Sequence, residues 1–88
     1  KIGRLPKVIF RKLGKEQAWG QLTPDNKFIE VDPRLKGQKL LIIALHEFFH
    51  WLFPKMSEDE IIVASEKTAA FLWKIGFRRV DNHEDKKV

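Results

Sequence analysis

Two histidines and a glutamate lie close together in the segment His46-Glu47-Phe48-Phe49-His50, which has the pattern HExxH. On an α-helix, residues four apart project about 40° from each other, so His46 and His50 can offer their imidazoles to one metal ion from successive turns. Glu47 projects about 100° from His46, where its carboxylate can take a proton from a water without occupying a ligand position. The pattern therefore predicts a metal site with a general base beside it.

The residues around this motif are strongly apolar, since residues 40–45 read LLIIAL and residues 51–53 read WLF. Burial of two imidazoles and a carboxylate on such a helix is costly unless they are paired or bound to a metal. The alternative is a buried helix whose two histidines are hydrogen-bonded core residues, and it requires polar partners for all three side chains. The context favours the metal site.

A second helix is predicted downstream, over residues 58–76. Ser57 is a suitable N-cap residue, and Glu60 stands at the reciprocal position of a capping box. With Ile62 taken as the centre of the apolar face, Ala69 and Trp73 fall within about 60° of it, and Glu66 lies at about 40°. We therefore expect the Glu66 carboxylate to point inward, where it needs a cation.

Two other glutamates of this helix have simpler explanations. Glu60 is accounted for by the capping box, and Glu58 leans inward but sits in the first turn, where a carboxylate favours the helix dipole. The expected ligands are thus His46, His50 and Glu66. Two histidines, one glutamate and an open fourth position form the ligand set of a catalytic zinc site.

The sequence HEFFH, followed by Glu66 on the next helix, resembles the gluzincin branch of HExxH metallopeptidases in a minimal form. It is similar in particular to small metallopeptidase domains encoded by phages and mobile elements, in which a short β-sheet precedes the HExxH helix. The resemblance implies a zinc-dependent endopeptidase, with Zn²⁺ on His46, His50 and Glu66 and with Glu47 as general base. Its substrate would be a peptide or protein.

The chain departs from larger gluzincins at two points. The position four residues after Glu66, where they usually carry an acidic residue, is Ala70, and there is no Tyr to stabilise an oxyanion. The remaining candidates for that oxyanion role are His83, Arg78 and Arg79. His83 stands in a polar tail, where the simpler expectation is a solvent-exposed residue.

Composition and length predict one compact domain over residues 1–88. Apolar residues make up 43% of the chain, enough for a modest core to which a bound metal would add stability. The absence of cysteine excludes disulfides and Cys-ligated zinc. The apolar run is too short to span a bilayer, so we expect a cytoplasmic protein without membrane contact. Because the chain begins with Lys1, it could be part of a longer protein.

The expected fold class is α+β in a minimal zincin-like arrangement. Three strands, over about 7–13, 17–22 and 28–32, would form a small antiparallel meander within residues 7–32. The HExxH helix should run from about 38 to 53 and end at Pro54. Because this helix is apolar nearly all round, it should lie between the sheet and the glutamate helix. Residues 78–88 form a charged tail.

The net charge of +5 raises a second class of function. A basic domain can be attracted to nucleic acid or to an acidic protein, but no helix-turn-helix signature or basic recognition helix accompanies the charge. The alternative to the peptidase is a non-catalytic metal-binding regulatory module of phage type, which binds DNA or a protein partner. A DNA-associated protein is therefore an expected partner or substrate in either case.

Overall fold

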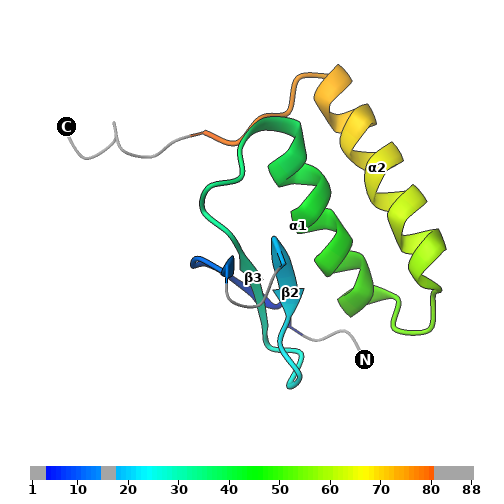
Figure 1. The fold of residues 1–88 in the computed structure, drawn as a ribbon. Helices are drawn as coiled ribbons and strands as arrows, with labels where there is room; N and C mark the ends of the chain where they lie inside the picture. The colour runs from blue at the N-terminus through cyan, green and yellow to red at the C-terminus, as the bar shows by residue number, and fades with distance from the viewer. Residues whose placement is uncertain (1–3, 15–17, 81–88) are drawn as a thin grey trace.

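The computed structural model describes residues 4–14 and 18–80 of the chain. Within them, a three-stranded mixed sheet packs on two helices, so the predicted α+β class is confirmed (Figure 1). The elements in chain order are β1 (Lys7–Phe10), β2 (Gly20–Leu22), β3 (Phe28–Val31), α1 (Gly37–Leu52) and α2 (Glu58–Lys74).

The sheet is not the predicted antiparallel meander. Its strand order is β1-β3-β2, with β2 antiparallel to the central strand β3 and β1 parallel to it. The prediction is wrong because the chain does not turn back after β1. It continues beyond the end of that strand, where Leu13 is buried, and then crosses to the opposite edge of β3.

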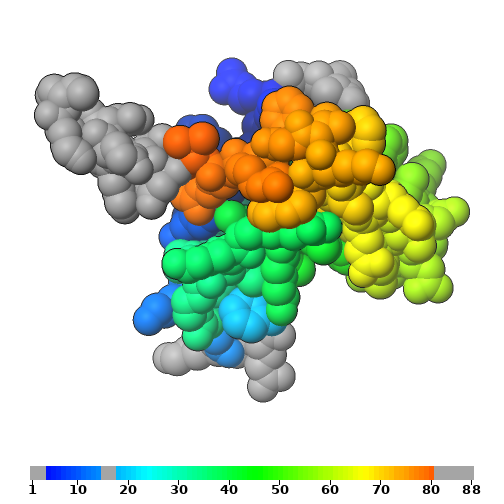
Figure 2. Space-filling view, turned by 90° about the horizontal axis from the view of Figure 1, so that it is seen from above, coloured from blue at the N-terminus to red at the C-terminus, as the bar shows by residue number. Residues whose placement is uncertain are grey.

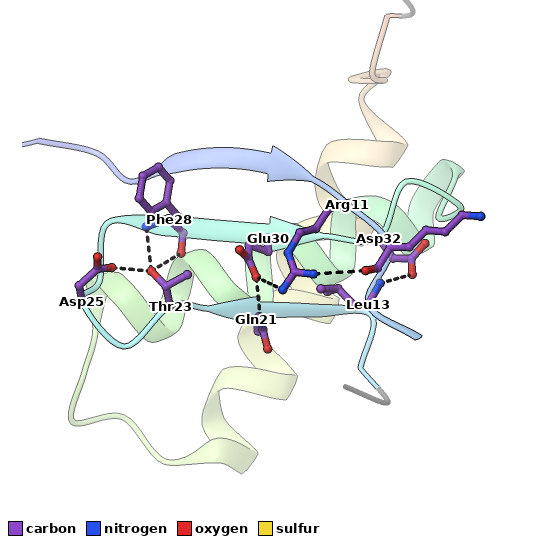
Figure 3. A network of polar contacts seen from close by, with 9 residues as sticks. Arg11, Leu13, Gln21, Thr23, Asp25, Phe28, Glu30 and Asp32 are labelled. Carbon is purple, nitrogen blue, oxygen red and sulfur yellow. Dashed lines mark hydrogen bonds and ion pairs between the residues drawn. The ribbon is translucent and has the colours of Figure 1, made fainter. Parts of the chain in front are cut away.

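Alternate residues of β3 face opposite sides of the sheet. Ile29 and Val31 face α1 and form the core with Leu35 and Leu40. On the other face, the Glu30 carboxylate accepts hydrogen bonds from Arg11 Nη2 at 3.0 Å and from Gln21 Nε2 at 2.6 Å (Figure 3). These donors, Arg11 first, lower the pKa of Glu30. On this polar face, Glu30 of β3 thus links Gln21 of β2 to Arg11, the residue that follows β1.

A buried carboxylate holds the chain together where β3 ends. Asp32 is fully buried, and its Oδ2 accepts hydrogen bonds from the Leu13 backbone N–H at 3.1 Å and from Arg34 Nη2 at 2.6 Å. The other oxygen accepts from the backbone N–H and the Nε of Arg34. The Arg34 guanidinium, with these backbone donors, holds the pKa of Asp32 well below its usual range. Asp32 therefore links Leu13, in the segment after β1, to Arg34, in the segment between β3 and α1.

We expect Asp32→Asn to lower the midpoint of thermal unfolding by several degrees near neutral pH, because the charged acceptor for Arg34 and Leu13 is lost. Since the folded pKa is depressed, the ionised carboxylate stabilises the fold above the unfolded pKa of about 3.8, and this stabilisation is lost as the pH falls toward the folded pKa. The difference between parent and variant should therefore stay constant between about pH 7 and about pH 5 and shrink as the pH falls below about 4, as measured by calorimetry. A pH-independent difference would contradict this account.

The first helix lies between the sheet and the second helix, as predicted. α1 contacts β2, β3 and α2, whereas α2 contacts none of the strands (Figure 1). The predicted capping box is confirmed, since Ser57 Oγ accepts from the Glu60 N–H at 3.1 Å and Glu60 Oε1 accepts from the Ser57 N–H at 3.0 Å. None of the described helices is long and apolar enough to cross a membrane.

Candidate metal centre

Three side chains converge near the end of α1 and the beginning of α2. His50 Nε2 lies 3.2 Å from His46 Nε2, and the Glu58 carboxylate lies 3.2 Å from His46 Nε2 and 2.9 Å from His50 Nε2. One donor atom from each residue lies within 4.8 Å of the other two. His46, His50 and Glu58 thus form a candidate metal site among the described residues.

The chemistry of these donor atoms fits a cation. If each Nε2 carried a proton that it donated to Glu58, two N–H groups would face each other at 3.2 Å. A shared metal ion removes this repulsion, because all three atoms then act as electron-pair donors. Two nitrogens bound to one tetrahedral zinc at about 2.0–2.1 Å lie roughly 3.3 Å apart, close to the observed separation. The separation of the donor atoms is therefore compatible with one metal ion bound by both imidazoles.

A short loop brings the third side chain to the histidines. α1 ends before Pro54, and the Met56 N–H donates to the Phe53 carbonyl at 3.0 Å in a turn that reverses the chain. α2 begins at Glu58, so its first residue lies against the last two turns of the antiparallel α1. The Ser57 cap fixes the start of α2 and therefore the position of Glu58.

Glu66 does not join this cluster. It is exposed, and it lies about 12 Å along α2 from Glu58, at a rise of about 1.5 Å per residue. The expected inward orientation of Glu66 is wrong because the buried face of α2 follows Ile61, Ser65 and Ala69, whereas Ile62 is 37% exposed. The carboxylate that the structure brings to His46 and His50 is that of Glu58.

The signal that could have identified Glu58 lies in the small residues of α2. Ser65 and Ala69 are fully buried against α1, and Ser65 satisfies its hydroxyl by donating to the Ile61 carbonyl at 2.7 Å. Small side chains let two helices approach closely, so they mark the contact face better than the large apolar residues do. Glu58 stands three residues before Ile61, on the same face.

Glu47 lies between the metal cluster and the sheet. Burial raises the pKa of Glu47, and the two neighbouring imidazoles offset only part of this increase. A Cβ atom at Gly20 would lie only 3.4 Å from Glu47 Cγ and 2.7 Å from Ile43 Cγ2. The lack of a side chain at Gly20 therefore allows β2 to pass directly beside Glu47.

The arginines considered for oxyanion stabilisation lie at the other end of the helices. Arg78 Nη1 donates to the Trp73 carbonyl at 2.8 Å, and its guanidinium stacks on the Trp73 ring. Arg79 lies over the ring of Phe10. Trp73 is about 22 Å along α2 from Glu58, so neither arginine is brought to the cluster. His83, the third candidate, lies outside the described residues.

Comparisons with known proteins identify no relative: no family model, no curated protein and no solved structure matches this chain. The geometry of the site is therefore the basis for assigning a function.

Proposed function

We propose that this chain is a zinc-dependent endopeptidase, in which His46, His50 and Glu58 hold the ion and Glu47 is the general base. The observation that carries the proposal is the convergence of donor atoms from His46, His50 and Glu58. The half-buried carboxylate of Glu47 lies on the same helix as the histidines and is not one of these donors. Two histidines and one carboxylate leave a position open, which distinguishes catalytic from structural zinc sites. Imidazole and carboxylate donors at this spacing suit zinc among the divalent metals.

When bound, zinc would supply Lewis-acid chemistry, polarising a peptide carbonyl and making a water more acidic. Glu47 accepts the proton of the attacking water and returns it to the amine that leaves. Its position beside Gly20 keeps its carboxylate between the two histidines and the edge of the sheet. In the apolar surroundings of α1, Glu47 is the carboxylate free for this proton transfer, since Glu58 pairs with the histidines.

The open edge of β2 offers a place for an extended substrate. The Trp19 carbonyl accepts from Asp32 N–H and the Thr23 N–H donates to the Phe28 carbonyl, so by alternation the main-chain groups of Gly20 and Leu22 point away from β3. A peptide that adds to this edge would pass next to Glu47. Residues 28–32 offer no such edge, because β3 is the central strand.

The full chain, loaded with one equivalent of zinc, is expected to cleave an unfolded protein such as reduced casein, and a chelator should stop the cleavage and lower the melting temperature. Metal content is measured by elemental analysis, and products by mass spectrometry. DNA-associated proteins form a second substrate panel, because a domain with a net charge of +5 is attracted to nucleic acid and thereby to proteins bound to it. Zinc binding without cleavage in either panel would contradict the peptidase proposal and favour the non-catalytic metal-binding module.

A further inference from the structure

The opposite edge of the sheet carries a second feature, which the metal centre does not use. An apolar groove of about 380 Å³ lies between β1, the first half of α1 and the end of α2. Its apolar walls include Phe10, Leu41, Ala44, Leu72, Trp73 and Phe77. Figure 2 looks onto this end of the molecule, where the end of α2, in orange, lies against α1, in green.

The apolar surface of this groove remains open to solvent. Phe10 is 40% exposed and Phe77 is 62% exposed, while Leu40 is the only residue of α1 that is buried. The reason is that α1 packs on β2 and β3 but not on β1, so the inner face of β1 is uncovered. Exposed apolar surface of this kind, beside a sheet edge, is typical of a binding site.

The main chain of β1 adds directional hydrogen-bonding groups to this surface. The Lys7 N–H donates to the Lys27 carbonyl and the Arg11 N–H to the Val31 carbonyl. In a strand the main-chain groups alternate in direction, so those of Val8 and Phe10 point away from β3. Among the described strands none pairs with this edge. The side chains of Val8 and Phe10 face the same side of the sheet as Ile29 and Val31, and Phe10 lines the groove.

Two arginines give the groove a charge. The Schellman turn at Gly76, in which the Phe77 N–H donates to the Leu72 carbonyl at 2.9 Å, directs the chain from α2 toward β1. Arg78 is held by Trp73, while the Arg79 guanidinium lies 4.4 Å from the centre of the Phe10 ring. Within the described part of the chain, no carboxylate forms a salt bridge with Arg79.

We propose that this groove binds an extended segment of a partner protein, which adds to β1 as a fourth strand. Its alternate apolar side chains fill the groove beside Phe10 and Leu41, and an acidic residue pairs with Arg79. The open main chain of β1 selects an extended backbone, and the Arg79 guanidinium, which lies over the Phe10 ring, attracts an acidic side chain. The site is separate from the β2 edge, so the inference does not depend on the peptidase proposal.

The test uses peptides selected from a random display library on the zinc-loaded full chain, with affinities measured by fluorescence polarisation. Peptides with alternating apolar residues and an acidic residue should weaken by about tenfold or more on Arg79→Glu, because a charge pair becomes a repulsion. Lys55→Glu makes the same charge change in the loop before α2 and should leave their affinity unchanged. In amide spectra, signals of Val8, Phe10 and Ala44 should shift, and those of Gly20 and Leu22 should not.

Strand addition is tested separately from charge. Val8→Pro removes one outward N–H, which an edge strand tolerates, and should also weaken binding by about tenfold. If this variant unfolds, N-methylation of alternate amides in the peptide makes the same test on the intact protein. Binding that is insensitive to N-methylation and to Arg79→Glu, or recovery of no such peptide, would overturn the proposal. A dimer in sedimentation that Arg79→Glu dissociates would assign the groove to a second copy of the chain instead.

Discussion

Replacing Glu47 by Gln is expected to lower peptide hydrolysis by about 10² to 10⁴, the usual loss when a positioned general base is removed. Gln keeps the shape of Glu next to Gly20 but lacks the basic oxygen that accepts the proton of water. Zinc content and melting temperature should remain those of the parent, because Glu47 is not one of the three clustered donors. Cleavage rates are compared on one substrate at equal zinc occupancy.

Glu66→Gln is the matched control for this experiment, since it makes the same chemical change at an exposed position of α2. It should cleave at the rate of the parent. A Glu47→Gln protein that cuts as fast as its parent would show that the proposed mechanism is wrong, whatever its zinc content. A variant that loses zinc as well would assign Glu47 to the ligand set instead.

Glu58→Gln is expected to weaken zinc affinity by more than about 100-fold, because loss of a group that only supports a ligand already costs 10- to 100-fold. The amide lacks the negative charge that lies 2.9 Å from His50 and 3.2 Å from His46. Glu66→Gln should bind zinc as the parent does. Affinities are measured by competition with a chromogenic chelator, alongside melting temperatures with and without the metal.

The pair of variants decides between the two glutamates. A large loss of affinity in Glu66→Gln with none in Glu58→Gln would restore the ligand expected from the apolar face centred on Ile62. A loss in neither would remove α2 from the metal site. Both variants exchange Glu for Gln on one helix, but only Glu58 lies in the first turn, where its charge also favours the helix dipole. Melting temperatures without metal measure that effect separately from the loss of a ligand.

The helices of this fold could be predicted because their signals are local. Pro54 ends α1, Ser57 and Glu60 cap α2, and the apolar character of α1 requires cover on two sides. The sheet could not be predicted in the same way. Pairing of β1 depends on the path taken between Leu13 and β2, and strand patterns do not encode whether a neighbour runs parallel or antiparallel.

The metal site was predictable in part for the same reason. His46, Glu47 and His50 share one helix, so their spacing alone sets their geometry. The third donor depends on how α2 faces α1, and there the large residues Ile62 and Trp73 suggested the wrong face. Ser65 and Ala69 decide the contact because they are small, a property that hydrophobicity does not measure.

The short loop from α1 to α2 also determines the order in which the molecule can assemble. Contacts between neighbours in sequence form faster than distant ones, because less chain entropy is lost when a small loop closes. The helical hairpin that contains His50 and Glu58 is such a local unit. Pairing of β1 with β3 is less local, because β2 lies between these two strands in the chain. A metal captured by the hairpin would hold the two helices together while the strands are still unpaired. With such a metal bound, folding would be faster when the metal is available during synthesis, and the apolar surface of α1 would be exposed to aggregation for a shorter time.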